Sequence, residues 1–271
     1  GREGMYEYMT ALSEDARPAA PLIEARQKAK AAAPAAGTFA IDRTAKLYIG
    51  GKQARPDGGY SQAIWSPTGK LLGHVGLGNR KDIRNAVEAA HAAKGWGKAT
   101  GHNRAQILYY MGENLSARAE EFAQRIKDQT GREGADEVEA AINRLFTYAA
   151  WAEKYDGAVK QVPMRAVALA MNEPVGVIGA LCPDEAPLLG FVSVMAPAIA
   201  MGNTCVLVPS QTAPLSATDF YQVLDTSDLP PGVVNIVTGV PQELAKPLAG
   251  HLDVDAVWSF SAARATWPGA S

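Results

Sequence analysis

The second half of the chain alternates short, continuously apolar runs with longer segments that carry apolar residues at helical spacing. The continuous runs predict buried strands, at 175–182, 204–208, 233–237 and 256–260. The segments between them predict single helices, at 188–201, 215–224 and 242–249. Strands without polar alternation that are separated by single helices are typical of parallel βαβ units. The pattern therefore predicts an α/β fold with a doubly wound, Rossmann-like parallel sheet.

The first half predicts a helical layer that follows a few short strands. The strands are expected at 47–51, 60–65 and 71–75. The helices are expected at 83–94, from Asn103 onward, at 119–130 and at 135–155. Asp82 and Asn103 are suitable N-cap residues for the first two of these helices, and Gly131 would end the third.

The chain divides into three parts by composition. Residues 1–10 show neither a helix cap nor a periodic pattern and do not resemble the start of a domain. Residues 11–40 are rich in Ala and Pro and are typical of a linker, with one helix expected near 22–33. From Arg17 to Lys52, seven basic residues stand against two acidic ones, which fits a solvated tether or, as the alternative, a strip that docks on an acidic surface. Residues 41–271 form the folded unit.

The composition of the chain argues against nucleic acid and membranes as binding partners. A net charge of −2 over 271 residues provides no general attraction for nucleic acid. The longest apolar run, 188–201, contains Pro197 and is too short to cross a bilayer, and no basic-then-apolar leader opens the chain. The two cysteines do not make a disulfide framework. We therefore expect a cytoplasmic, reducing environment with no membrane or nucleic-acid partner.

The sequence pattern alone assigns a catalytic or ligand-binding role to few residues. Cys182 and Cys205 both lie in predicted strands, where a cysteine usually acts as a small hydrophobic residue. The histidines are scattered without zinc spacing, at His74, His91, His102 and His251. Gly76 and Gly78 match the dinucleotide-binding fingerprint weakly, because the third glycine is absent. We therefore expect no metal site.

Glu185 is the strongest candidate for a functional side chain. It lies in Pro183-Asp184-Glu185-Ala-Pro187, just past the carboxyl end of a predicted strand, where α/β sheets bind ligands. A carboxylate there could act as an acid or a base. The alternative is that Asp184 and Glu185 cap the helix that begins near Pro187, because negative charge suits a helix N-terminus.

Several longer motifs occur in one order along the chain. They are Leu47-Tyr-Ile-Gly-Gly-Lys, Trp65-Ser-Pro-Thr-Gly, Glu173-Pro-Val-Gly-Val, Ala196-Pro-Ala-Ile-Ala-Met-Gly-Asn-Thr and Asp228-Leu-Pro-Pro-Gly-Val-Val-Asn-Ile-Val-Thr-Gly. Together they resemble the N-terminal and cofactor-binding part of an aldehyde dehydrogenase, over residues 47–260. The resemblance implies a parent enzyme that oxidises aldehydes to carboxylic acids with NAD, using a nucleophilic Cys and a catalytic Glu.

The positions that matter for cofactor and catalysis depart from the family. Glu185 replaces the Asn of Pro-Trp-Asn-Phe-Pro, which in the family donates to the developing oxyanion. Val208 and Gln211 replace the Lys and Glu of Lys-Pro-x-Glu, which hold the ribose hydroxyls. Ala262 and Trp267 stand where the family has glycines that let the phosphates approach the backbone. We therefore expect no catalytic residue, no cofactor-binding residue and no bound NAD on this chain.

The resemblance also suggests a place for the chain in a larger protein. The family's catalytic Glu and Cys follow on segments beyond Ser271, while residues 1–10 resemble the oligomerisation strand that ends a preceding module. That order resembles the two-module branch of the superfamily, family sixteen, in which a shortened and silent copy follows a catalytic module.

The resemblance implies a role in assembly. The expected partner is the NAD-bearing catalytic module of the same polypeptide, within a homo-oligomer. The helix at 215–224 and a shortened oligomerisation hairpin at 161–171 would provide the contacts. The alternatives are a fragment of an active enzyme, a module with a residual regulatory nucleotide site, a small-ligand sensor around Glu185, and an inert appendage.

Overall fold

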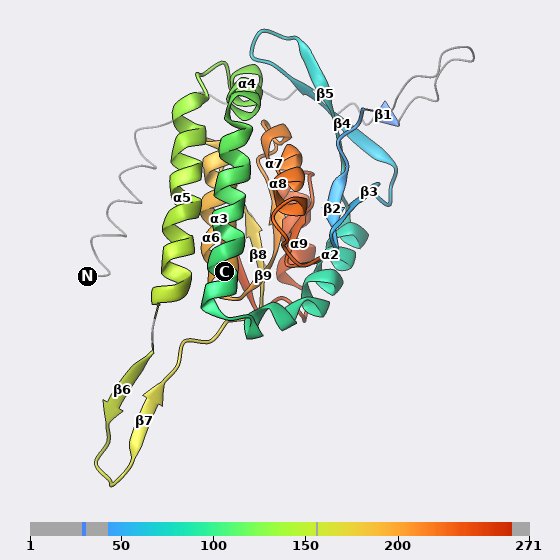
Figure 1. The fold of residues 1–271 in the computed structure, drawn as a ribbon. Coiled ribbons are helices and arrows are strands. Elements are labelled where there is room, and N and C mark those ends of the chain that lie inside the picture. Colours follow the sequence, from blue (N-terminus) through green and yellow to red (C-terminus); the bar gives the residue numbers. More distant parts are fainter. Residues whose placement is uncertain (1–28, 31–42, 156, 262–271) are drawn as a thin grey trace, which may run out of the picture.

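Six strands form a central sheet in the computed structural model, which describes residues 29–30, 43–155 and 157–261 (Figure 1). The strand order is β11-β8-β9-β10-β2-β3. Four strands of the second half run parallel: β8 (Val177–Leu181), β9 (Thr204–Val208), β10 (Val234–Ile236) and β11 (Ala256–Ser259). Two antiparallel strands, β2 (Leu47–Ile49) and β3 (Lys52–Ala54), extend the sheet beyond β10. The predicted α/β fold is confirmed, with a mixed sheet in place of a purely parallel one.

Helices cover both faces of this sheet, as a doubly wound fold requires. Connecting helices are α6 (Pro187–Ala200), α7 (Leu215–Asp219), α8 (Tyr221–Asp225) and α9 (Pro241–Ala249). Cys205 and Leu207 point to the face that α6, α7 and α8 cover, and their neighbours Val206 and Val208 point to the face with α9. The alternation along β9 explains why the whole strand is apolar: each side chain meets a helix, whichever way it points.

The first half adds the outer layers. Its helices are α2 (Arg80–Ala92), the 3-10 helix η1 (Lys94–Lys98), α3 (Gly101–Ala117), α4 (Ala119–Thr130) and α5 (Ala135–Lys154). α2 packs beside α9, while α3 and α5 lie over α6 on the opposite face (Figure 1). The remaining strands are β1 (Ala29–Lys30), β4 (Tyr60–Trp65) and β5 (Leu71–Gly76) in one small sheet, and β6 (Ala158–Gln161) and β7 (Val167–Ala170) in a separate hairpin.

Two predicted helix starts are wrong by a few residues. Asn79 caps α2, and Asp82 is the third helical residue, whose carboxylate accepts the backbone N–H of Asn79 in a capping box. Thr100 caps α3 by accepting the backbone N–H of Asn103. In both cases the expected cap residue lies in the first turn of the helix. The residue that caps the helix lies earlier in the sequence.

The linker prediction is tested at two residues only. Ala29–Lys30 forms β1 and pairs antiparallel with β4, so the helix expected near 22–33 is wrong at these positions. A strand that pairs with β4 gains hydrogen bonds from a neighbour, whereas a short Ala-rich helix is marginal in water. Residues 1–10, the rest of the linker, Ala262 and Trp267 lie outside the described residues.

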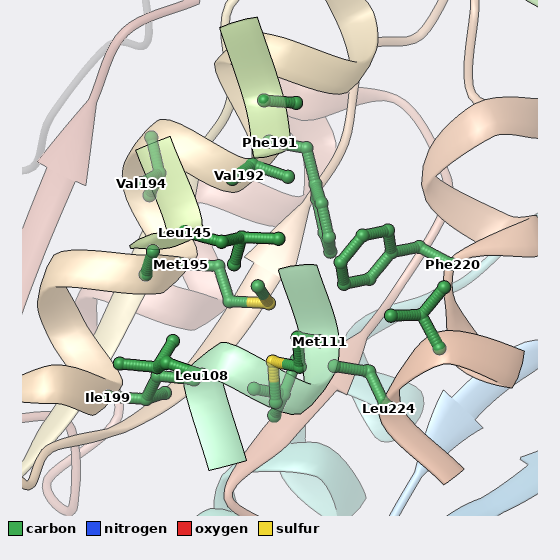
Figure 2. Packing of buried hydrophobic residues seen from close by; sticks show 14 of the residues in the cluster. Leu108, Met111, Leu145, Phe191, Val192, Val194, Met195, Ile199, Phe220 and Leu224 are labelled. Carbon is green, nitrogen blue, oxygen red and sulfur yellow. The ribbon is translucent and has the colours of Figure 1, made fainter. Parts of the chain in front are cut away.

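A cluster of aromatic rings closes the core between α4, α6 and α7. The ring centroids of Phe191 and Phe220 lie 5.6 Å apart, and those of Phe122 and Phe220 lie 6.2 Å apart. Figure 2 shows Phe191 and Phe220 facing each other, with Met111 and Leu224 beside them. All three phenylalanines are at most 1% exposed, so these rings join helices of both halves of the chain.

The single helix predicted at 215–224 is instead two short helices, α7 and α8, which meet at Phe220. Their apolar side chains, Leu215, Phe220, Val223 and Leu224, are at most 4% exposed. The chain's own core therefore covers these apolar side chains, and contact of this segment with a partner stays a prediction. In the part of the chain that the structure describes, every helix is too short or too polar to span a bilayer.

Replacing Phe220 by Ala should lower the free energy of unfolding by about 3–5 kcal/mol, because it removes a fully buried ring from between two others. Urea denaturation followed by circular dichroism measures the change. Tyr110→Ala is the control, since Tyr110 is 45% exposed on α3. Equal losses in the two variants would show that the aromatic cluster does not hold the helices together.

Candidate functional site

The carboxyl ends of β8 and β9 are joined by one carboxylate. Asp184, in the loop after β8, accepts the Ser210 hydroxyl at 2.6 Å and the Gln211 backbone N–H at 3.2 Å, both from the loop after β9. The Ser210 oxygen in turn accepts the Ala213 N–H at 3.1 Å, and Ser210 is 2% exposed. This Asp184 bridge crosses the edge at which parallel sheets usually bind ligands.

The N-terminus of α6, at the same edge, is capped by a residue from another helix. Glu137 of α5 accepts the backbone N–H groups of Leu188 and Leu189 at 2.9 and 3.1 Å. Arg132 lies 3.8 Å from the Glu137 carboxylate and donates to the backbone carbonyl of Glu185. The positive end of the α6 dipole therefore faces a carboxylate from the protein itself.

The prediction that Asp184 and Glu185 cap α6 is wrong. The N-cap residue is Ala186, and no side chain of its own caps the helix. Asp184 is instead engaged with the β9 loop, and the cap comes from Glu137, about fifty residues upstream. Only tertiary packing places Glu137 there, although its position in the first turn of a helix was visible in the sequence.

Glu185 contributes its backbone to the site while its side chain points to solvent. Its carbonyl accepts a hydrogen bond from Arg132, and the residue is exposed. The carboxylate that does lie inside the edge is its neighbour Asp184. The two carboxylates of this loop therefore take different positions, and a functional role for Glu185 stays a prediction.

Val208 and Gln211 take different positions at the end of β9. Val208 is fully buried and packs with Leu181, Leu244 and other apolar side chains between the sheet, α2 and α9. Gln211 is half-buried, and its backbone N–H belongs to the Asp184 bridge. The end of β9 thus contributes the apolar side chain of Val208 and the amide of Gln211, and the loop after β8 contributes the carboxylate of Asp184.

Neither cysteine is suited to nucleophilic attack. Cys182 and Cys205 are at most 2% exposed, and burial raises the pKa of both thiols well above the usual range. The negative charge of Asp184 raises the pKa of Cys182 further. Since the thiolate is the reactive form, both residues act as small hydrophobic side chains, as their positions in strands predicted.

The remaining candidates form no site. His91 and His251 lie 3.7 and 3.9 Å from the carboxylate of Asp253, and across the described ranges no group of three or more His, Cys, Asp or Glu side chains could hold a metal. A Cβ at Gly78 would lie 2.6 Å from the Val237 side chain. Gly78 therefore serves close packing and does not form a phosphate cradle.

The β6–β7 hairpin is the most apolar exposed element. It extends away from the body of the molecule (Figure 1). Val159 pairs with Leu169, and Gln161 pairs with Val167, so these four side chains share one face. Val159, Val167 and Leu169 are 72%, 72% and 65% exposed, which is unusual for adjacent large apolar side chains. The hairpin predicted at 161–171 is present, with its first strand beginning at Ala158.

Known proteins are similar to this chain in sequence and fold. The sequence model described as "Aldehyde dehydrogenase family" matches residues 54–266. Aldehyde dehydrogenase family 2 member B4, mitochondrial, of Arabidopsis thaliana is 35% identical over 69% of this chain and 36% of its own length. Aldehyde dehydrogenase B of Escherichia coli is 34% identical over 74% of this chain and 40% of its own length. The chain thus spans about two fifths of these curated relatives.

Solved structures of aldehyde dehydrogenases have a fold similar to that of this chain. The structure titled as an NAD+ complex of aldehyde dehydrogenase from Bacillus cereus superposes with a TM-score of 0.77 at 28% identity, over 80% of this chain and 46% of its own. A putative aldehyde dehydrogenase from Burkholderia cenocepacia gives a TM-score of 0.77 at 27% identity, over 79% of this chain and 45% of its own.

Asp184→Ala should lower the free energy of unfolding by about 1–3 kcal/mol, because it leaves the buried Ser210 hydroxyl without its charged acceptor. Glu185→Ala, the neighbouring control, should change it by less than about 0.5 kcal/mol, as exposed positions usually do. Both are measured by urea denaturation. A larger loss from Glu185→Ala would contradict the assignment of Asp184 as the bridging carboxylate.

Proposed function

This chain belongs to the aldehyde dehydrogenase family, and on that premise we propose that it is a non-catalytic module for the structure and assembly of a two-module, NAD-dependent aldehyde dehydrogenase. In this proposal it is the silent, shortened copy found in family sixteen of the superfamily. Its partner is the catalytic module of the same polypeptide. The observation that carries the proposal is the apolar face of the β6–β7 hairpin, which projects from the body of the molecule with Val159, Val167 and Leu169 exposed.

The site residues support a silent module. At the position where the family has a neutral donor for the oxyanion, this chain has Glu185, which accepts hydrogen bonds when ionised. Its neighbour Asp184 adds a second carboxylate to the same loop. Two negative groups would oppose the charge that develops on an aldehyde oxygen.

The residues at the sheet edge fit the NAD cofactor poorly. Val208 is packed into the apolar core and has no hydrogen-bonding group in its side chain. Gln211 replaces a carboxylate by a weaker acceptor, and its backbone N–H already donates to Asp184. Each lost contact to a ribose hydroxyl removes about 1 kcal/mol or more, so affinity should fall by roughly tenfold to a hundredfold.

The assembly role follows from the cost of exposed apolar surface. Burying a large aliphatic side chain contributes about 1.5–3 kcal/mol, and the hairpin exposes three of them on one face. A hairpin also has unpaired strand edges, which add to a neighbouring sheet by backbone hydrogen bonds. A linker between the modules would raise their effective concentration, so a modest interface would suffice.

One alternative has an observation in its favour. Relatives with about one third identity carry the names of aldehyde dehydrogenases, and a solved structure holds NAD+. A fragment of an active enzyme, or a module that keeps a regulatory nucleotide site, would then bind the cofactor. The binding experiment below separates these alternatives from a silent module.

The 271-residue chain should give no saturable heat with NAD at concentrations up to about 1 mM, because the lost contacts to the ribose weaken binding. A dissociation constant of about 1 mM corresponds to a binding free energy of only about 4 kcal/mol. It should also form no NADH with varied aldehydes above a heat-denatured sample. An active aldehyde dehydrogenase titrated in the same buffer is the positive control. Micromolar NAD binding, or turnover, would overturn the silent-module proposal.

The double variant V159K/L169K, placed in the full-length polypeptide that carries this chain, should weaken assembly at least about tenfold, since it puts charge on the apolar hairpin face. Ala170→Lys lies on the opposite face of the same hairpin and is the matched control. Light scattering measures the mass and NADH formation the activity. Unchanged mass and activity in the double variant would refute the assembly role, as would a full-length polypeptide without a second module.

A further inference from the structure

The turn between β3 and β4 places an aspartate directly before two glycines. The backbone N–H of Gly59 donates to the carbonyl of Pro56 at 2.9 Å, so Asp57 and Gly58 are the central residues of a four-residue turn. Both are exposed, and the Asp57 side chain is 37% exposed. Because the turn hydrogen bond uses the N–H of Gly59, it does not engage the N–H of Gly58. Gly58 also has no side chain to shield its nitrogen.

This arrangement favours a reaction of the chain with itself. When the Gly58 nitrogen attacks the carboxyl carbon of protonated Asp57, an N–Cγ bond forms and the amide proton and the carboxyl hydroxyl leave together as water. The product is a five-membered succinimide ring, which water reopens at either carbonyl. Opening at Cγ restores aspartate, whereas opening at the former backbone carbonyl leaves the main chain running through the side chain, as isoaspartate. The net change is an isomerisation without a change in mass.

We propose that Asp57 is a site of isoaspartate formation and that Lys81 slows the reaction in the folded protein. The Lys81 ammonium, in the first turn of α2, donates to the Asp57 carboxylate at 2.5 Å. An ionised carboxylate has no hydroxyl to release, so a contact that favours the ionised form disfavours ring closure. The hydrogen bond from Lys81 lowers the pKa of Asp57, and the charges of Lys81 and Arg84 lower this pKa further.

The same turn is anchored to the start of α2. The backbone N–H of Asp57 donates to one carboxylate oxygen of Asp82 at 3.0 Å, while the other oxygen accepts the N–H of Asn79 at 2.9 Å. Isoaspartate adds one main-chain atom inside this turn and moves its carboxylate. The turn hydrogen bond and the contacts with α2 would then compete for one geometry, so isomerisation should loosen the cap of α2.

The sequence contains a second Asp-Gly pair, which provides an internal comparison. Complete tryptic cleavage leaves Asp57 in the peptide 53–70, since Arg55 precedes a proline. It leaves Asp156, which lies outside the described residues, in the peptide 155–160. The two peptides report the two sites separately. The β3–β4 turn belongs to neither strand of the β6–β7 hairpin, so the result for 53–70 does not depend on the proposed assembly role.

The folded 271-residue chain, incubated for weeks at physiological temperature and neutral pH, should accumulate isoaspartate in the peptide 53–70. A protein isoaspartate methyltransferase with labelled S-adenosylmethionine methylates the new carboxyl group and so measures it in each peptide. Lys81→Gln should raise the rate at least about threefold, because it removes the charge that keeps Asp57 ionised. Arg80→Gln is the matched control, since it removes the same charge from an exposed neighbour and should leave the rate unchanged.

Gly58→Ala tests the chemistry of the step itself. It should lower isoaspartate in 53–70 at least about tenfold, because a methyl group beside the attacking nitrogen hinders its approach. The added Cβ would lie 3.0 Å from the Tyr60 ring, which is exposed and can shift, and circular dichroism confirms that each variant is folded. A wild-type chain without isoaspartate in 53–70 would overturn the proposal. So would equal rates in Lys81→Gln and Arg80→Gln, or undiminished isoaspartate in Gly58→Ala.

Discussion

Burial of the parallel strands on both faces is the constraint on which the rest of this structure depends. Side chains that alternate along β9 enter two separate apolar clusters, one beneath α6, α7 and α8 and the other beneath α2 and α9. Every connecting helix must therefore turn its apolar face inward. In α7 and α8, the apolar side chains around Phe220 are buried in this way. The exposed apolar surface is consequently found on elements outside this double layer, above all on the β6–β7 hairpin.

The same architecture brings unrelated polar groups together at the carboxyl ends of the strands. Asp184 joins the loops after β8 and β9, and Glu137 reaches the N-terminus of α6 from α5. Here their hydrogen-bonding groups are satisfied by the protein, and the net charge they add is negative. The edge is therefore held together by the protein's own carboxylates.

Sequence reasoning located nearly all elements because local patterns determine them. Uninterrupted apolar runs predicted β8 to β11 within about two residues, and Gly131, with a positive φ of 73°, ends α4 as expected. The resemblance to aldehyde dehydrogenases was likewise carried by contiguous motifs. The errors were of a different kind. Asp82 and Asn103 were mistaken for caps because any polar residue near a helix start fits the pattern, and the helix at 215–224 was not expected to divide at Phe220.

The sequence by itself determined the α/β class, the order of strands along the chain, the burial of both cysteines and the loop that holds the candidate site. These follow from hydrophobic periodicity and from short-range turn and cap chemistry, which act between neighbouring residues. Tertiary structure alone decided that Asp184 and not Glu185 faces the sheet edge, that Glu137 caps α6, and that the apolar side chains of α7 and α8 are covered while those of the hairpin are not. Each of these depends on which groups far apart in the chain meet in space, and no local pattern encodes such a meeting.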